Sequence, residues 1–225
     1  MRIESGPMEG MRLATSEHIS HAHIRGTYEL DNQMAIDRVV YPGFICYDVG
    51  ASIGYLSLLM ARKAKHVYSF EPAPHAVAEI RKHIQANGLQ NITIVPSPVS
   101  DREREVEFSL TDNAYGSAIS HGETKWPTLK LKTITLDDFV AAHEFPDFIK
   151  LDVEGEEGRA LEGARSILQK RKTVICAEIH NEEAAATCRN VLNEFGYQLT
   201  DLEGKPIQEI GPIAVGETHV LAIPG

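Results

Sequence analysis

The chain contains 225 residues, of which 43% are hydrophobic and 24% are charged, a composition typical of soluble globular domains. No apolar run reaches the roughly 18 residues that a membrane-spanning helix needs, and residues 1–6 lack the apolar stretch of a signal peptide, so we expect a cytoplasmic protein without a membrane partner. The formal net charge of −10 and the scattered lysines and arginines argue against a nucleic-acid partner, because such binding needs a basic surface. The three cysteines are far apart and odd in number, which favours buried thiols over disulfides or metal ligands.

Residues 1–25 show little periodicity and carry His18, His21 and His23. Their H-x-x-H-x-H spacing is compatible with a metal site, but no cysteine or acid cluster completes it. We therefore predict surface histidines on a flexible N-terminal arm. Residues 26–225 would then form a single domain, because one domain is the simplest division of a chain of this length.

The first regular elements are predicted after this arm. Asp31 is suited to cap a helix whose apolar positions include Met34 and Val39, and this helix would lie across the mouth of a cofactor site. Residues 44–49 are mostly apolar, β-branched or aromatic, which is typical of a strand buried on both faces. After a glycine-containing turn, residues 55–62 favour a helix with one apolar side. The unit is a strand, a tight turn and a helix.

The turn contains Gly50, Ala51, Ser52 and Gly54. A dinucleotide-binding turn needs a glycine at the position of Ser52, so that the backbone can approach a pyrophosphate. Asp48 precedes the turn, and its carboxylate would repel a diphosphate but attract a ligand that carries an ammonium and a sulfonium group. S-adenosylmethionine is such a ligand, and we expect these five residues to bind it as the cofactor.

The next strand ends at Glu71, which Pro72 follows. An acid about twenty residues after the first glycine of the turn is placed to bind ribose hydroxyls, and this role suits a nicotinamide cofactor equally well. A helix over residues 74–87 and a strand over residues 92–95 are predicted next. The loop after that strand contains Ser97, which we expect near the adenine of the cofactor.

A long polar segment, residues 111–128, lies between two predicted antiparallel strands at residues 105–110 and 129–133. A loop of this length inside a compact domain is usually functional, and we predict a lid over the substrate. The remaining predicted elements are strands at residues 147–155, 173–180, 197–200 and 219–223, and helices that start at residue 135 and span residues 156–170 and 182–194. This alternation predicts an α/β fold with a doubly wound, mostly parallel, Rossmann-like sheet whose ligands bind at the carboxyl ends of the strands.

Polar side chains gather at those predicted strand ends, namely Asp48, Glu71, Asp152, Glu154, Glu178 and His180. Because the carboxyl ends of parallel strands meet at one edge of a sheet, we expect these side chains to converge on an active site. Helix capping or a solvated loop is the alternative explanation for each acid, and it carries equal weight for Glu154 and Glu178.

Several blocks of the sequence resemble the FkbM-type S-adenosylmethionine-dependent methyltransferases, namely residues 48–54, Glu71 with Pro72, residues 150–157 and residues 161–164. The resemblance covers residues 26–180, and its most specific part is the block Lys-Leu-Asp-Val-Glu-Gly. It implies a class I methyltransferase domain that methylates a hydroxyl oxygen of a small molecule or glycan, such as a sugar or a polyketide-type product. The family's usual asparagine in the glycine loop is Ser52 here. The resemblance also places Glu29 near the methionine amine of the cofactor, and Gly116 and Ser117 match a family loop more loosely.

A sulfonium methyl group is already activated, so the enzyme needs only to align a hydroxyl with the S–CH₃ bond and assist its deprotonation. We predict His180 as the general base, with Asp152 or Glu154 orienting the acceptor or the cofactor amine; a histidine packed at a strand end is the structural alternative. In a second mechanism, Asp152 or Glu154 with Glu178, His180 or Asn181 would hold a divalent cation that lowers the pKa of the hydroxyl. Sequence spacing does not decide between the two, and we assign no metal ligand from it.

Two other functions stay open at this point. One is a nicotinamide-dependent oxidoreductase, and the other is an S-adenosylmethionine-binding module without catalytic activity. The sequence names neither the acceptor nor the oligomeric state.

Overall fold

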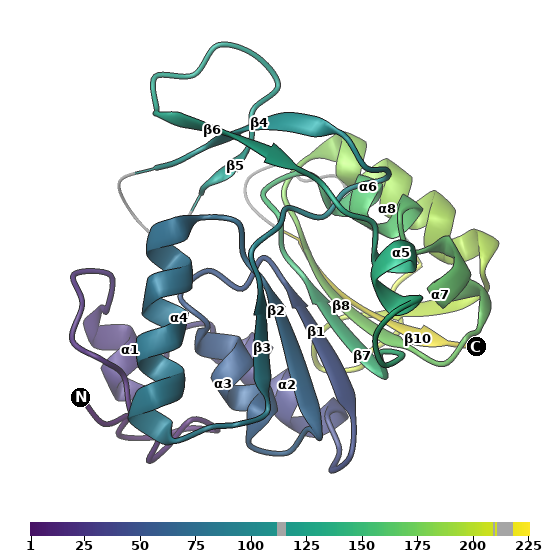
Figure 1. Cartoon of the computed structure of the whole chain (residues 1–225). Coiled ribbons are helices and arrows are strands. Elements are labelled where there is room, and N and C mark those ends of the chain that lie inside the picture. Colours follow the sequence, from purple (N-terminus) through teal and green to yellow (C-terminus); the bar gives the residue numbers. More distant parts are fainter. Residues whose placement is uncertain (112–115, 209, 211–217) are drawn as a thin grey trace.

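A seven-stranded sheet forms the centre of the chain in a computed structural model, which describes residues 1–111, 116–208, 210 and 218–225 (Figure 1). The strand order is β3-β2-β1-β7-β8-β10-β9. The strands are β1 (Ile45–Val49), β2 (His66–Phe70), β3 (Ile92–Val95), β7 (Phe148–Leu151), β8 (Val174–Ile179), β9 (Tyr197–Thr200) and β10 (Thr218–Pro224). The strands from β3 to β8 in this order run parallel, and β10 runs antiparallel to both β8 and β9. The predicted α/β fold with a doubly wound, mostly parallel sheet is confirmed.

Helices cover both faces of the sheet. Successive strand residues point to opposite faces, so each strand contributes side chains to two apolar layers. Cys46 and Val67 belong to an apolar layer with α2 and α3, whereas Tyr47 and Ile149 pack in the opposite layer with α5 to α8. The helices are α2 (Leu30–Val39), α3 (Tyr55–Ala61), α4 (Pro74–Asn87), α5 (Leu136–Val140), α6 (Glu157–Glu162), α7 (Arg165–Gln169) and α8 (Glu182–Glu194). Burial on both faces explains why the strand at the centre of the sheet is so rich in apolar residues.

The connection order reverses at β1. The chain first adds β2 and β3 on one side of β1, and later adds β7 and β8 on the other. The N–H groups of Gly50 and Ala51 donate to the Phe70 carbonyl at 3.0 Å, and the Asp152 N–H donates to the Val49 carbonyl at 3.0 Å, so the carboxyl ends of three strands are joined. Ligands of open α/β sheets bind at such a reversal, outside the carboxyl ends of the strands.

The N-terminal segment differs from the predicted flexible arm. An antiparallel bridge joins Arg2 and Arg12, and the side chains of Ile3, Met8 and Leu13 are buried in the same apolar layer as α3. Periodicity did not reveal this packing, because single apolar residues anchor an irregular chain. The predicted arm is therefore wrong as a description of these residues.

Histidine packing in this segment also differs from the prediction. His23 lies in a short helix, α1 (His21–Arg25), and is buried rather than on the surface, whereas His21 is exposed and His18 half-buried. The Nδ1 atom of His23 accepts a hydrogen bond from the Ser20 N–H at 3.1 Å. Burial, reinforced by His83, lowers the pKa of His23 to about 4, so the ring is neutral at physiological pH.

Two predicted helices have different boundaries in the structure. Glu29, not Asp31, is the N-cap of α2, its backbone is left-handed, and Met34 is exposed. The predicted helix 156–170 is broken into α6 and α7 around Gly163, where a Cβ would lie 2.2 Å from the Ser100 carbonyl oxygen. Close approach of another loop therefore interrupts a sequence that has adequate helix propensity.

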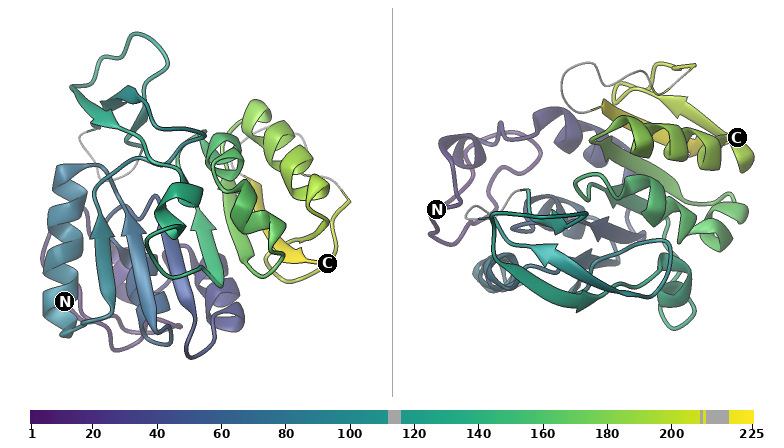
Figure 2. Two further views of the ribbon diagram at one scale, coloured as in Figure 1. Left: turned by 45° about the vertical axis from the view of Figure 1, so that its right-hand side comes forward. Right: turned by 90° about the horizontal axis from the view of Figure 1, so that it is seen from above.

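A second, three-stranded antiparallel sheet stands at the top of the molecule in Figure 1, and Figure 2 shows it from two further sides. It consists of β4 (Glu105–Ser109), β5 (Ala118–Ile119) and β6 (Thr128–Lys132) in the order β5-β4-β6. Phe108 of β4 packs on Ala73 and Ala76 at the start of α4, close to the carboxyl edge of the large sheet. Within the predicted lid, residues 111–128, Ala118 and Ile119 form β5 and Thr128 begins β6, and residues 112–115 lie outside the described residues.

Two further features concern the cysteines and the lengths of the described helices. Cys46, Cys176 and Cys188 are free and buried, as predicted. Within the described ranges, none of the helices combines the length and the apolar character needed to span a membrane.

We predict that Met8→Ala lowers the free energy of unfolding by about 2–5 kcal/mol, because it leaves a cavity under α3. Met8 is 0% exposed, whereas Met34 is 55% exposed, so Met34→Ala serves as the matched control and should change stability by less than about 0.5 kcal/mol. Urea unfolding of both variants measures the difference. Equal stabilities would mean that residues 1–13 do not pack on the domain.

Candidate functional site

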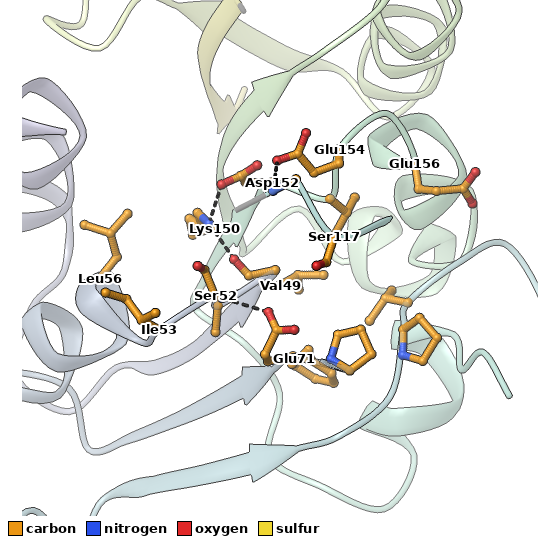
Figure 3. A pocket seen from close by; sticks show the side chains of 18 of the residues that line it. Val49, Ser52, Ile53, Leu56, Glu71, Ser117, Lys150, Asp152, Glu154 and Glu156 are labelled. Carbon is orange, nitrogen blue, oxygen red and sulfur yellow. Dashed lines mark hydrogen bonds and ion pairs between the residues drawn. The ribbon is translucent and has the colours of Figure 1, made fainter. Parts of the chain in front are cut away.

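A pocket lies at the carboxyl ends of β1, β2 and β7, where the connection order reverses (Figure 3), and encloses about 870 Å³ when the space open to solvent is included. Ligands of open α/β sheets bind at this place. Nine of the residues predicted from the sequence line this cavity: Glu29, Gly50, Ala51, Ser52, Glu71, Pro72, Ser97, Asp152 and Glu154. Asp48, Gly54 and His180 are not among the lining residues.

The glycine loop is shaped by close backbone contact. Gly50 has a φ of +80°, and a Cβ on it would lie 1.6 Å from the Asp152 carbonyl oxygen. Only glycine can occupy this position without displacing the end of β7. Gly54 has a different function, since it is the left-handed N-cap of α3 and packs against Ile80. The loop therefore presents Gly50, Ala51 and Ser52 to the cavity and keeps Gly54 behind them.

Glu71 is fixed by the same loop. One carboxylate oxygen accepts the Ser52 N–H and the other accepts the Ala73 N–H, each at 2.8 Å. Each oxygen retains a second lone pair for a ligand in the cavity. Burial raises the pKa of Glu71 to about 7, although these two hydrogen bonds and Lys150 favour the ionised form. This carboxylate is suited to accept two neighbouring hydroxyl groups.

Asp48 is placed differently from our expectation. Its side chain is fully buried, accepts a hydrogen bond from the Ser57 hydroxyl, and lies 3.8 Å from the Lys150 ammonium. Burial raises the pKa of Asp48, and Lys150 and Ser57 oppose this effect. Asp48 therefore acts on the site through its neighbours and does not contact the cavity.

Lys150 is a lining residue that we did not predict. Its ammonium donates to the Gly50 carbonyl and to Asp152 Oδ2, both at 2.9 Å. Burial alone would lower the pKa of Lys150, but the carboxylates of Asp152 and Asp48 outweigh it and raise the pKa. Figure 3 shows the side chain between the glycine loop and Asp152. The sequence did contain a signal for this role. Lys150 stands between apolar residues in a buried strand, and a buried lysine needs acidic partners.

Asp152 and Glu154 line the cavity beyond the end of β7, and His180 lies behind them. Its Nε2 is 3.6 Å from Asp152 Oδ1 and 3.9 Å from Glu154 Oε2. Its Nδ1 donates to Glu157 Oε1 at 3.0 Å. Burial would lower the pKa of His180, but Glu157, Asp152 and Glu154 outweigh it and raise the pKa to about 9. A histidine with this pKa is mostly protonated at neutral pH, which speaks against the predicted role of His180 as general base.

The two residues offered as alternative metal ligands lie in the same region. Glu178 Oε2 contacts His219 Nε2 at 3.0 Å and the Asn32 amide at 3.4 Å. The Asn181 side-chain oxygen accepts the Ala184 N–H at 2.8 Å and so caps α8. Asn181 is thus committed to a structural contact, whereas Glu178 lies with Asp152 and His180 in one cluster.

Backbone strain is concentrated around the cavity. Among the described residues, the non-glycine residues with positive φ are Glu29 (46°), Ser52 (50°), Glu154 (54°) and Arg171 (51°). The first three line the cavity. A left-handed conformation costs about 1–2 kcal/mol for most residues, and such strain is typical of functional sites. The strain supports a functional interpretation of this cavity.

Part of the cavity wall comes from the N-terminal segment, which we did not assign to the site, and from the predicted lid. Tyr28 stacks on the buried ring of His23 at 3.9 Å and meets Tyr55 edge-on at 5.6 Å, so the N-terminal segment supports one wall. Gly116 donates its N–H to Glu154 Oε1 at 3.1 Å, and Ile119 also lines the cavity. The second sheet is therefore in contact with the cavity, whereas its action as a lid stays a prediction.

Comparison with known proteins gives a family match. The model of the Methyltransferase FkbM domain matches residues 48–199. A hexuronic acid methyltransferase, AglP from Haloferax volcanii, is 29% identical over 139 residues, which cover 60% of this chain and 56% of that protein. The chain thus spans little more than half the length of this relative.

Two solved structures are similar in fold. Methyltransferase FkbM from Methylobacillus flagellatus KT superimposes with a TM-score of 0.53 at 20% identity, covering 80% of this chain and 43% of that chain. Precorrin-6y C5,15-methyltransferase from Geobacter metallireducens GS-15 superimposes with a TM-score of 0.56 at 13% identity, covering 95% of both chains. At such identities the structures establish a shared class I methyltransferase fold.

We predict that Gly50→Ala lowers the free energy of unfolding by more than about 3 kcal/mol, because the new Cβ would collide with the backbone at Asp152. Gly88→Ala is the control, since Gly88 also has a positive φ (+63°) but has no atom within 4 Å of an added Cβ. Its cost should stay near the left-handed penalty of about 1–2 kcal/mol. Urea denaturation of the two variants compares them, and similar losses would contradict the close contact between the loop and β7.

Proposed function

Because the chain belongs to the FkbM family of methyltransferases, we propose that it transfers a methyl group from S-adenosylmethionine to an oxygen of a small molecule or glycan. The observation that carries this proposal is that the Gly50–Ser52 loop and Glu71 line the same cavity and are joined by a hydrogen bond from Ser52 to Glu71. The cavity lies where the order of strand connections reverses. The loop offers a close backbone surface, and Glu71 offers a carboxylate for the two ribose hydroxyls. The family membership sets aside a nicotinamide oxidoreductase.

The lining residues fit the parts of this cofactor. Glu71 and Pro72 would lie at the ribose, and Ser97 with Pro98 would lie beside the adenine. Glu29 and Asp152 would bind the methionine ammonium, since both are carboxylates that line the cavity on the other side of the glycine loop. Lys150 would limit the negative charge there and hold Asp152 in place.

The chemistry asked of this chain is positioning and proton removal. The cofactor supplies an activated methyl group. Glu154 is our candidate for the proton acceptor, because it lines the cavity and the Gly116 N–H holds one of its carboxylate oxygens at 3.1 Å. His180 is then not the proton acceptor, and its ring Nε2 faces the carboxylates of Asp152 and Glu154 at 3.6 and 3.9 Å. This replaces our prediction that His180 is the base.

The acceptor is proposed from a relative and from charge. The Haloferax volcanii relative is a hexuronic acid methyltransferase, so a uronic acid or a glycan that contains one is our first candidate. The net charge of −10 is unfavourable for a nucleic-acid acceptor. The cytoplasmic location expected from the sequence stays a prediction.

We predict that S-adenosylhomocysteine binds stoichiometrically in calorimetric titration and that Glu71→Gln weakens it about tenfold to hundredfold, the loss expected when charge-assisted hydrogen bonds become neutral. Glu162→Gln is the control, because Glu162 pairs with Arg165 on the surface and lies away from the cavity. A folded wild-type protein that does not bind this ligand would refute the proposed function.

The same titration has a predicted pH dependence. The pKa of Glu71 is raised to about 7, so the acid is increasingly protonated below that pH and loses acceptor strength. Affinity should therefore rise about tenfold between pH 6 and pH 8 and level off above. Glu71→Gln should lack this dependence, and an unchanged profile in that variant would assign the effect to another group.

We predict that incubation with uronic acid glycans and labelled S-adenosylmethionine gives a methyl ether on a ring hydroxyl. Mild alkali distinguishes the product, since a methyl ester is hydrolysed and an ether is stable. A label released by alkali would place the methyl group on the carboxyl oxygen instead. Absence of transfer to any hydroxylated acceptor, with cofactor binding intact, would favour the non-catalytic module.

A further inference from the structure

Asp152, Glu178 and His180 form a cluster beside the cavity at the ends of β7 and β8. One ligand atom from each residue lies within 4.8 Å of the other two, and all three side chains are half-buried. We propose that this cluster binds one divalent cation of the Mg²⁺ or Mn²⁺ type. Two carboxylates and one imidazole leave several coordination positions open, and carboxylate oxygens are the donors that these ions prefer.

The orientation of His180 is the second observation that points to a cation. Nδ1 donates to Glu157 Oε1 at 3.0 Å, and this same oxygen accepts the backbone N–H groups of Val153 at 3.1 Å and Gly155 at 2.9 Å. Glu157 is fully buried, so the ring is held firmly with Nε2 toward the carboxylates. Histidines that bind metals characteristically donate the other ring N–H to a carboxylate in this way.

The spacing in front of Nε2 fits a cation better than a direct hydrogen bond. Nε2 lies 3.6 Å from Asp152 Oδ1 and 3.9 Å from Glu154 Oε2, beyond ordinary hydrogen-bond distance. Ligand atoms about 2.0–2.3 Å from a common ion lie roughly 3–4.5 Å apart. The side chains would need only small movements to close on an ion.

The partners of the two acids direct them to the same place. Lys150 holds Asp152 Oδ2 at 2.9 Å, which leaves Oδ1 on the side of His180. His219 and Asn32 contact Glu178 Oε2 at 3.0 and 3.4 Å, from β10 and α2. Three strands and a helix thus fix this cluster. With Glu154 and Glu157, the cluster gathers four carboxylates around one lysine and two histidines, Lys150, His180 and His219. A divalent cation would offset negative charge in this half-buried group.

The role of the cation rests on the proposed function. Asp152 lines the cavity, so an ion bound there could contact the acceptor hydroxyl and lower its pKa. The hydroxyl proton would pass to the Glu154 carboxylate. The oxygen would then form its bond to the methyl carbon while the S–CH₃ bond breaks, and sulfur would retain that electron pair as S-adenosylhomocysteine.

The test is a titration of the full chain with Mn²⁺, in which the electron paramagnetic resonance signal of free Mn²⁺ measures how much of the ion is unbound. We expect one ion per chain, displaced by Mg²⁺, and at least tenfold weaker binding in His180→Gln and in Glu178→Gln. His143→Gln is the matched control, because this exposed histidine bonds to the Phe139 carbonyl far from the cluster, and it should bind as wild type does. Circular dichroism checks folding, and if one cluster variant fails to fold, the other provides the comparison.

No Mn²⁺ binding by the wild type, or equal binding by wild type and a folded cluster variant, would overturn the cation site. Titration with S-adenosylhomocysteine in EDTA separates this result from the proposed function. If that ligand binds and methyl transfer proceeds at the full rate in EDTA, the cation inference fails while the methyltransferase proposal stands. If Mn²⁺ binds at the cluster but S-adenosylhomocysteine does not bind, the cation site stands and the proposed function fails.

Discussion

The site depends on the contacts that the buried ammonium of Lys150 makes with its neighbours. The ammonium bonds to the Gly50 carbonyl and to Asp152, and it lies 3.8 Å from Asp48. These three partners belong to the end of β1, the glycine loop and the segment after β7. Removing one member of such a buried group leaves a charge without compensation, which typically costs about 3–5 kcal/mol. The lysine therefore couples the geometry of the glycine loop to the acids on the opposite side of the cavity.

Other buried carboxylates organise the same edge through backbone contacts. Glu71 accepts N–H groups from Ser52 and Ala73, and Glu157 accepts those of Val153 and Gly155. Glu156 connects the second sheet to the start of α6, since it accepts the Ser100 hydroxyl at 3.1 Å and contacts the His121 ring at 2.6 Å. Loops beyond the strand ends lack the ladder bonds of a sheet, and these acids satisfy their N–H groups instead. Much of the acidic rim thus stabilises loops, and only some members face a ligand.

The sequence predicts the elements whose signal is local. The buried strand at residues 44–49, the glycine turn and the helix from Pro74 to Asn87 follow from runs of residue types and from capping positions. Nine of the predicted site residues line one cavity, because the ends of parallel strands meet at one edge. The failures all depend on distant contacts. Gly163 meets Ser100 and breaks a helix, and Met8 is buried by residues far along the chain.

Asp48 is a charged residue whose role also depends on distant contacts that the local sequence does not reveal. Its position before the glycine turn suggested a carboxylate open to the ligand, and the sequence carries no sign that Lys150 and Ser57 enclose it. Asp48 lies beside the buried Lys150 of the adjacent parallel strand, and it therefore compensates the lysine charge instead of contacting a ligand.

In contrast, Glu29, Ser52 and Glu154 reach the cavity from three separate loops with left-handed backbones. Such strain persists only where surrounding contacts determine the conformation, so this part of the cavity is preformed. The second sheet reaches the cavity through Phe108 and Ile119, and the loop before β5 reaches it through the contact of Gly116 with Glu154, so this wall depends on fewer fixed contacts than the strained loops do.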